Sequence, residues 1–370
     1  MKITLNKSTF LNGLFLAQKI SEGNASIQPI LSNIQLTANS DGKIFCRATD
    51  MSTSVTSEFQ AEVFQQGTAT VNGKLLYQLV SNLGGKEVTL EKKENSIFLT
   101  SQKSRFELNG LRDEDFPNFN FYEDSSYVNF ESEILRELLD HTLFAVATDE
   151  TKPHLGGIYL VTEKNIAKSV ATDGHKLALA EYPFEGKFSI PNGIIIPRKG
   201  VNDIMKMLSD DSANVGLYYD KELKILGLKT DSTKMNIKLI DSKFPPYEQV
   251  IPQYQDNKLV IPKEEFLGAL KRINLLFEGS DAGVILKIQK DSIILTGIDT
   301  LKGKGTEEIE VDYTGEKMQI AFNIKFFDTI VNKIQGKEFS IFLHNPKSPA
   351  LIKPIEISNF IAVLMPIRLD

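Results

Sequence analysis

An acidic and a basic side chain stand two residues apart in the segment ATDGH (171–175), which lies between two apolar runs. Asp173 and His175 could form an acid–base pair, since proton transfer in enzymes most often uses histidine or a carboxylate. An enzyme built on this pair would also need a nucleophile or a bound metal. The other three histidines show no metal-ligand spacing such as HxxxH. The sequence also lacks the glycine-rich loops that bind nucleotide phosphates. An enzyme centred on Asp173 and His175 is therefore one hypothesis, but no second catalytic group supports it.

The composition is that of a globular protein with more than one domain. At 370 residues the chain exceeds what one hydrophobic core usually supports, so two or three domains are expected. The sequence has neither a run of roughly 18 apolar residues, which a membrane span needs, nor a signal-peptide core, so we expect a cytoplasmic protein without a membrane partner. The net charge of −6 argues against nucleic-acid binding over the whole surface. The single cysteine, Cys46, is expected to be a small core residue.

The surroundings of Asp173 occur three times in the chain. Asp50, Asp173 and Asp299 each end a pair of runs in which polar and apolar residues alternate, and they are separated by 123 and 126 residues. A hydrophobic period of two is typical of half-buried antiparallel strands, so each copy predicts a β-hairpin. The aspartate recurs and the histidine does not. We therefore expect the aspartates to hydrogen-bond a turn after the strand.

Two stretches with apolar residues at helical spacing flank each hairpin. In the stretch that follows each hairpin, equivalent positions are occupied by Leu75, Val201 and Phe327, which are 126 residues apart. Five of the six stretches carry net positive charge, and one is net acidic, so positive charge is concentrated on the helices of an otherwise acidic protein. The helices before the hairpins are predicted at 7–20, 131–146 and 262–277, and those after the hairpins at 73–83, 197–208 and 323–334.

Each repeat is therefore predicted to be an α+β unit of two helices and several antiparallel strands. Proline interrupts both helices and strand ladders, so the proline- and aromatic-containing segments 115–126 and 243–256 are predicted to be linkers. The predicted domains are 1–124, 125–254 and 255–370.

Five motifs, in this order and spacing, resemble one family. They are SRFELNGL (104–111), VATDGHKLA (170–178), IIPRKGV (195–201), KFPPYEQVIP (243–252) and VLMPIRL (363–369). Together with the threefold repeat, they make the whole chain similar to the bacterial DNA sliding clamp, the beta subunit of DNA polymerase III. The resemblance implies a non-catalytic ring of two identical subunits, arranged head to tail, with helices lining a hole for duplex DNA and sheets outside.

The resemblance also implies partners. A clamp of this family holds the DNA polymerase III catalytic subunit on duplex DNA independently of sequence, is loaded by a separate clamp loader, and binds other polymerases and repair proteins through short peptides. It needs no metal or other cofactor. A peptide-binding hub that has lost DNA encirclement is a third hypothesis, which the acidic helix predicted at 131–146 suggests.

By resemblance, partner peptides would bind an apolar pocket between the second and third domains. Gln249 stands where the family pattern often has arginine, and Lys152, Pro153 and His154 replace an arginine and aromatic residues near the rim, so we expect an altered peptide preference. The expected wall consists of Leu155, Thr172, Gly174, His175, Lys176, Leu177, Pro245, Gln249, Val250, Val363, Met365 and Ile367.

Two further surfaces are expected. In the ring contact, Arg105, Phe106 and Leu108 of one subunit would meet Leu275 and Leu276 of the other. Glu307 and Glu308 would be partners for Arg105. The candidates for phosphate contact, all cations on the predicted helices, are Lys74, Arg198, Lys199, Lys206, Lys271, Arg272, Lys325 and Lys333.

Overall fold

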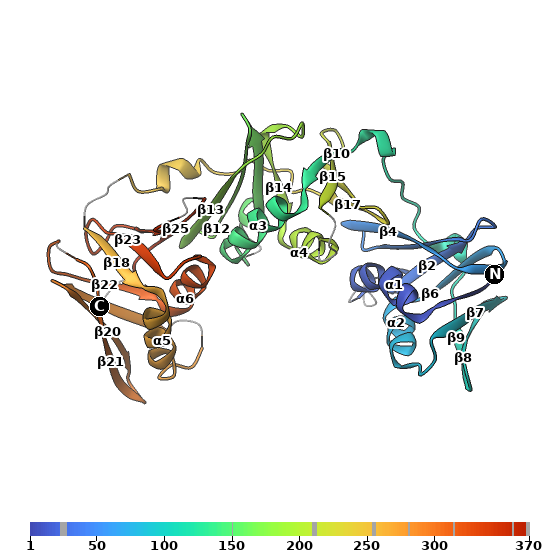
Figure 1. The fold of residues 1–370 in the computed structure, drawn as a ribbon, viewed down its shortest axis with the longest axis horizontal. Helices are drawn as coiled ribbons and strands as arrows, with labels where there is room; N and C mark the ends of the chain where they lie inside the picture. The colour runs from blue at the N-terminus through green and yellow to red at the C-terminus, as the bar shows by residue number, and fades with distance from the viewer. Residues whose placement is uncertain are drawn as a thin grey trace. The chain divides into compact units, whose positions relative to one another are not determined.

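A computed structural model describes residues 1–22, 28–149, 151–208, 213–253, 257–279, 282–313, 315–356 and 359–367 (Figure 1). The chain forms two compact units. No helix in these ranges is long and apolar enough to cross a membrane. Unit 1 comprises Met1–Arg136, Gly186–Phe188 and Lys199–Leu239, and unit 2 comprises Glu137–Glu185, Ser189–Arg198 and Ile240–Asp370.

Unit 1 contains two antiparallel sheets. The first has eight strands in the order β10 (Val128–Glu131), β15 (Asn214–Asp220), β16 (Ile225–Lys229), β17 (Thr233–Lys238), β4 (Thr53–Gln60), β3 (Lys43–Thr49), β2 (Asn33–Ala38) and β6 (Gly67–Asn72). The second has five, β5 (Glu62–Gln65), β1 (Lys2–Asn6), β7 (Glu87–Lys93), β8 (Ser96–Ser101) and β9 (Ser104–Asn109). Burial alternates along most of these strands, which places one face of each sheet on the core.

Helices α1 (Lys7–Ser21) and α2 (Gly73–Asn82) lie side by side in unit 1 (Figure 1). Asn6 and Asn72 cap their first turns by accepting hydrogen bonds from backbone N–H groups. The helices approach closely at Gly73, where an added Cβ would lie 2.6 Å from Ser21 Oγ. Helix α4 (Arg198–Met207) belongs to unit 1 from its second residue onward, and α3 (Ser132–Thr142) contributes residues to both units.

Unit 2 also contains two antiparallel sheets. The first has eight strands in the order β14 (Ile190–Pro197), β11 (Gly157–Glu163), β12 (Ile166–Thr172), β13 (Lys176–Pro183), β25 (Phe360–Leu364), β24 (Ala350–Pro354), β23 (Glu338–Phe342) and β18 (Lys258–Pro262). The second has four, β21 (Gly303–Glu310), β20 (Ser292–Asp299), β19 (Gly283–Gln289) and β22 (Met318–Asn323). Helices α5 (Lys263–Asn274) and α6 (Ile324–Lys333) pack together through Phe266 and Phe327, whose ring centroids are 4.8 Å apart.

The predicted α+β class is confirmed, with a helix in each of the six predicted windows and a hairpin at each of the three predicted places. The repeat pattern alone did not indicate that neighbouring repeats join edge to edge. Strand β4 pairs with β17, and β13 pairs with β25, so each eight-stranded sheet continues from one repeat into the next. Because the sheets are continuous there, the two boundaries between the three predicted domains stay a prediction.

Candidate functional site

The recurring aspartates have the same structural role in all three repeats. Asp173 Oδ1 accepts hydrogen bonds from the backbone N–H groups of His175 and Lys176, both at 2.9 Å. Asp50 and Asp299 accept from the equivalent N–H groups two and three residues later, at 2.6 to 2.9 Å. The prediction that these residues hydrogen-bond a turn is confirmed. Asp173 bonds the backbone of His175 and not its imidazole, which removes the main argument for an acid–base pair.

The second oxygen of Asp173 holds a buried lysine. Lys176 is only 8% exposed, its ammonium forms an ion pair with Asp173 Oδ2, and the same nitrogen lies 3.8 Å from the centroid of the Phe326 ring. Burial alone would raise the pKa of Asp173, but the hydrogen bonds from the ammonium and from the two backbone N–H groups outweigh it, and the pKa lies below its usual range. The charge of Lys176 is therefore compensated inside the protein.

The turn that begins at Asp173 forms one wall of a pocket of about 520 Å³ in unit 2. Gly174 has a φ of 92°, which a residue with a Cβ rarely adopts, and its Cβ position faces open space. Nine of the twelve predicted wall residues line this pocket: Thr172, Gly174, His175, Lys176, Leu177, Gln249, Val250, Val363 and Met365.

Three elements position these side chains. Strands β13 and β25 pair with Leu177 opposite Val363, and the N–H of Met365 donates to the carbonyl of His175 at 2.9 Å. The third element is a 3₁₀ turn at Tyr247–Val250, which Tyr247 anchors in the core beneath the pocket. Together these contacts fix the pocket floor, while Val250 and Met365 remain 53% and 41% exposed at its rim.

Three predicted wall residues lie outside the pocket lining. Leu155 is buried in the core cluster that includes Leu177 and supports the floor from below. The backbone N–H of Ile367 donates to Ala321 in the four-stranded sheet at 2.8 Å, and Pro245 is half-buried in the linker. Sequence reasoning missed four lining residues, three of which directly follow Val250 and could have been found by extending the linker motif: Ile251, Pro252, Gln253 and Pro349.

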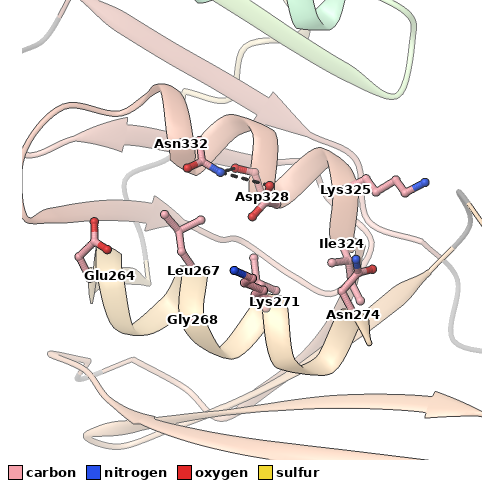
Figure 2. Close-up of a pocket in the computed structure, with 10 residues that line it drawn as sticks. Glu264, Leu267, Gly268, Lys271, Asn274, Ile324, Lys325, Asp328 and Asn332 are labelled. Carbon is pink, nitrogen blue, oxygen red and sulfur yellow. Dashed lines mark hydrogen bonds between the residues drawn. The ribbon is translucent and has the colours of Figure 1, made fainter. Parts of the chain in front are cut away.

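Two of the predicted phosphate-contacting cations are exposed and unpaired among the residues that the structure describes. Lys271 on α5 and Lys325 on α6 line a groove of about 530 Å³ between the two helices (Figure 2). The groove also contains the acids Glu264 and Asp328, and Asp328 accepts a hydrogen bond from Asn332 at 3.1 Å. Its free positive charge therefore belongs to the two lysines.

Other predicted phosphate contacts have partners within their own unit. Arg198 donates to the carbonyl of Val146 at 3.2 Å. Three more cations form ion pairs at 2.7 Å, namely Lys74 with Glu22, Arg272 with Glu307, and Lys333 with Asp140. A DNA phosphate would have to compete with these carboxylates for each cation.

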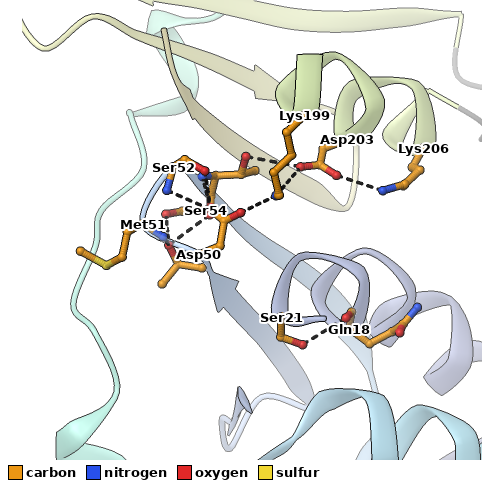
Figure 3. Close-up of polar contacts among 11 residues, drawn as sticks. Gln18, Ser21, Asp50, Met51, Ser52, Ser54, Lys199, Asp203 and Lys206 are labelled. Atoms are coloured by element: carbon orange, nitrogen blue, oxygen red, sulfur yellow. Dashed lines mark hydrogen bonds and ion pairs between the residues drawn. The ribbon is translucent and has the colours of Figure 1, made fainter. Parts of the chain in front are cut away.

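Lys199 and Lys206 belong to a charge cluster in unit 1 (Figure 3). The ammonium of Lys199 pairs with Asp50 in the β3–β4 turn and with Asp203 on its own helix, the latter at 3.0 Å, and Lys206 also pairs with Asp203 at 3.0 Å. The two carboxylate side chains are 4% and 3% exposed. Burial lowers the pKa of Lys199, but the two carboxylates outweigh it and raise the pKa above its usual range. Lys199 therefore connects α4 to the turn of the first repeat.

The residues predicted for the ring contact lie on two edge strands and beside α5. On β9, the last strand of its sheet, Phe106 is 39% exposed, whereas Leu108 is buried against its own sheet. Leu275, directly after α5, is 77% exposed. Glu307 on the edge strand β21 already holds Arg272 through two hydrogen bonds of 2.8 and 2.7 Å. The exposed apolar candidates are therefore Phe106 and Leu275.

Comparison with known families accounts for the threefold repeat. Models of the N-terminal, central and C-terminal domains of the DNA polymerase III beta subunit match residues 1–120, 129–246 and 248–368, respectively. The chain belongs to the DNA polymerase III beta-subunit family of sliding clamps. The resemblance inferred from the motifs is thus confirmed, and the chain is a bacterial sliding clamp for DNA polymerase III.

Relatives of this sliding clamp match it from end to end. The beta sliding clamp of Caulobacter vibrioides is 32% identical, and the alignment covers 100% of both chains. The crystal structure of the beta subunit from Thermotoga maritima has a TM-score of 0.92 at 26% identity, with 100% of each chain covered. A sliding clamp from Bartonella birtlesii, solved with griselimycin bound, has a TM-score of 0.91 at 29% identity over 100% of each chain.

Proposed function

We propose that two copies of this chain form a head-to-tail ring around duplex DNA and tether the replicative polymerase for processive synthesis. The observation that carries the proposal is the ordered match of all three beta-subunit domain models to one chain. A head-to-tail contact between unlike ends closes into a ring when the rotation permits, and equivalent repeats favour such closure. The chain acts in this proposal as a non-catalytic protein of the bacterial cytoplasm and uses no cofactor.

Exposed apolar side chains at two edges support the ring contact. Phe106 on β9 and Leu275 after α5 lie beside sheet edges whose backbone groups have no neighbouring strand among the described residues. An uncovered edge with apolar side chains invites association with another chain. We propose that β9 of one subunit meets β21 of the next.

The solution mass tests this contact directly. We expect wild type to have a mass near twice 41.4 kDa, and Leu275→Asp and Phe106→Asp to have the mass of one subunit. Leu223→Asp is the matched control, because Leu223 is 62% exposed in a turn outside the proposed contact. A monomeric wild type at micromolar concentration would overturn the ring and favour the peptide-binding hub.

Topological binding of DNA is the second test. A closed ring should stay on nicked circular DNA at salt concentrations that remove it from linear DNA of the same length. The double variant Lys271→Gln, Lys325→Gln should show a weaker salt dependence of initial DNA binding. Each lost phosphate contact makes the negative slope of log K against log salt shallower by about 0.9. Equal retention on circular and linear DNA would contradict encirclement.

The pocket in unit 2 is proposed to bind peptides of the polymerase catalytic subunit, the clamp loader and repair proteins. Its apolar floor and the adaptable Met365 side chain suit leucine and phenylalanine anchors. The griselimycin bound to the Bartonella clamp provides a competitor. We expect griselimycin to displace a fluorescent Leu- and Phe-containing peptide from wild type, and the absence of any peptide binding would contradict this part of the proposal.

A further inference from the structure

A second pocket, which we call the linker pocket, lies in unit 1 between the eight-stranded sheet and the linker 115–126. It has a volume of about 460 Å³ and is lined by residues of β3, β4, the β16–β17 hairpin and the linker. Phe59 of β4 packs against Gly13 of α1. Thr56, which lines the pocket, points to the other face of the same strand, because alternate residues face opposite sides. The linker pocket is therefore distinct from the peptide pocket and from the helices proposed to face DNA.

Three cations stand in one row across the strands that form the pocket wall. Arg47 on β3 is the strand partner of Thr56 on β4. Thr56 is in turn the partner of Lys234 on β17, which is opposite Lys229 on β16. Side chains paired in this way lie side by side on one face of a sheet. Because neighbouring strands are about 4.8 Å apart, the three cations arise within about 15 Å of one another.

One exposed carboxylate compensates the two lysines of this row. Asp124 Oδ1 lies 2.6 Å from Lys234 Nζ, and its Oδ2 lies 2.9 Å from Lys229 Nζ. The side chain of Asp124 is 65% exposed, whereas those of Lys234 and Lys229 are 26% and 29% exposed. The hydrogen bonds from Lys229 and Lys234 lower the pKa of Asp124 to about 2, so the two ammonium groups strongly favour negative charge at this point.

The other charges of the lining do not complete this compensation. Arg47 donates to the carbonyl of Phe119 and has no carboxylate partner among the described residues. Glu58 is paired with Lys43 at 2.6 Å. Asp231 is exposed in the β16–β17 turn, and no ion pair links it to the row in the part of the chain that the structure describes. Three cations therefore face one carboxylate that contacts them.

The equivalent row of unit 2 is apolar. Thr56 and Leu179 each follow their turn aspartate by six residues, and the strand partners of Leu179 are Val170 and Ile361. Val170 and Leu179 are buried in the core cluster that includes the aromatic residues of the second linker. Packing of a linker on this row is thus achieved without charge, so packing alone does not account for the three cations of unit 1.

We propose that the linker pocket binds a phosphate or polyphosphate group, whose oxygens replace the Asp124 carboxylate between Lys229 and Lys234. Asp124 acts as an internal competitor. Its two oxygens show that the two ammonium groups can hold an oxyanion through charge-assisted hydrogen bonds. A phosphate carries more negative charge than a carboxylate, and its further oxygens can accept hydrogen bonds from other donors of the lining, such as Arg47 and Thr56.

Displacement of Asp124 by such a ligand costs little. Ion pairs with an exposed partner contribute little to stability, because water solvates the released group. Asp124 is already mostly in water and loses no buried position when it turns away. The lysines are less exposed than Asp124, so an incoming anion is attracted to charges that solvent screens less.

Isothermal titration calorimetry with inorganic pyrophosphate, on the full chain in magnesium-free buffer, tests the proposal. Wild type should bind one pyrophosphate per subunit in this pocket. Asp124→Asn should bind it at least fivefold more tightly, because the competing carboxylate is gone. A purely structural Asp124 would not produce this gain. The double variant Lys229→Met, Lys234→Met should lose the saturable binding.

Two control variants separate this site from general charge effects. Asp231→Asn removes the same charge from the same lining without releasing a lysine, and it should change the Kd less than twofold. The double variant Lys271→Gln, Lys325→Gln in the groove of unit 2 should bind pyrophosphate as wild type does. Equal or weaker binding by Asp124→Asn, or no saturable binding by either wild type or Asp124→Asn, would overturn the proposal.

Tripolyphosphate and ATP, which carry the same number of phosphate groups, distinguish the sources of the ligand. Equal affinities would identify the site as one for a free oxyanion. Tighter binding of ATP would identify the phosphates of a nucleotide, with the base beside the exposed parts of Phe119 and Phe121. In both cases the gain in Asp124→Asn should persist, and its absence for both ligands would contradict the role of Asp124 as competitor.

Discussion

Neighbouring repeats join at one place in each unit. The two junctions have the same strand pairing but differ in how the linker packs on the sheet. In unit 1, β4 pairs with β17, and in unit 2, β13 pairs with β25, with both pairs antiparallel and adjacent to an aspartate turn. The junction of unit 1 is held by polar contacts to a linker, whereas the junction of unit 2 leaves an apolar pocket. The junction of unit 1 also has a pocket, of about 460 Å³, but charged side chains such as Arg47, Glu58 and Lys234 line it. The same repeat thus produces a polar junction in unit 1 and an apolar one in unit 2.

In unit 1, the backbone of the linker accepts hydrogen bonds from side chains of the sheet. Asn236 donates to the carbonyl of Asn120 at 3.0 Å, and Lys234 donates to that of Tyr122 at 3.2 Å. The Arg47 guanidinium donates to the carbonyl of Phe119 and lies 4.3 Å from the centroid of its ring. These contacts hold the linker on the sheet, and the pocket that remains between linker and sheet is lined by charged and polar side chains as well as aromatic ones.

In unit 2, the linker is anchored by its aromatic rings instead. Phe244 is buried and stacks on Tyr159, with ring centroids 4.9 Å apart and planes inclined by 7°, and Tyr247 is buried in the same cluster. The chain that follows, from Gln249 to Gln253, runs along the rim of the pocket and does not fill it. The linker of unit 2 therefore borders an apolar pocket, whereas the linker of unit 1 borders a charged one.

The largest expected effect comes from placing a charge in the apolar junction of unit 2. Met365→Asp should weaken binding of the fluorescent Leu- and Phe-containing peptide by at least fiftyfold, because a carboxylate would replace an apolar side chain that the peptide is proposed to cover. Met51→Asp, in the aspartate turn of unit 1, is the control: Met51 is 66% exposed, and its replacement should change the Kd less than twofold. The measurement is fluorescence anisotropy with both variants. A comparable loss in Met51→Asp would mean that the two junctions do not differ as proposed.

The next effect distinguishes two lysines at equivalent positions of their repeats. Lys199→Met should lower the free energy of unfolding by about 1–3 kcal/mol, because the buried carboxylates of Asp50 and Asp203 lose the ammonium that they share. The effect is moderate because Lys199 is half exposed, and solvent screens its charge. Lys325→Met, 126 residues later, removes an unpaired exposed ammonium and should change stability by no more than about 0.5 kcal/mol. Urea unfolding followed by tyrosine fluorescence compares the two, and equal midpoints would contradict the structural role of Lys199.

The same cluster predicts how stability changes with pH. Burial raises the pKa of Asp50, but Lys199 and the turn hydrogen bonds outweigh it, so the folded-state pKa lies below the unfolded value. A depressed carboxyl pKa contributes stability above the unfolded value, near pH 4, and this contribution is lost as the pH falls through the folded value. Between pH 6 and pH 3, the urea midpoint should therefore fall more steeply for wild type than for Lys199→Met. Parallel curves would contradict the linkage.

The helices and strands could be predicted from the sequence because the same pattern of apolar and polar residues occurs three times in the chain. Hairpins and helices follow from periodicity, and the turn aspartates follow from their recurrence while His175 does not recur. What could not be predicted depends on contacts between distant segments. The pairing of Lys199 with Asp50 joins residues 149 positions apart. No local pattern distinguishes that lysine from Lys325, whose ammonium has no partner within the described ranges.

The smallest expected effect comes from loosening the polar junction of unit 1. Arg47→Met keeps most of the apolar length of a half-buried side chain but removes the hydrogen bond to Phe119 and the contact of the cation with its ring. A single cation–aromatic contact of this kind contributes about 0.5–2 kcal/mol, so the urea midpoint should fall slightly.

The linker should respond more clearly than the global stability does. Its backbone would lose one of three side-chain hydrogen bonds, so limited proteolysis should cut Arg47→Met between residues 117 and 122 several times faster than wild type. Lys234→Met, which removes the neighbouring bond to Tyr122, should act in the same direction. Unchanged cleavage in both variants would mean that the aromatic side chains, and not the polar contacts, hold this linker, and the contrast between the two junctions would then lie only in the shape of the sheet beneath them.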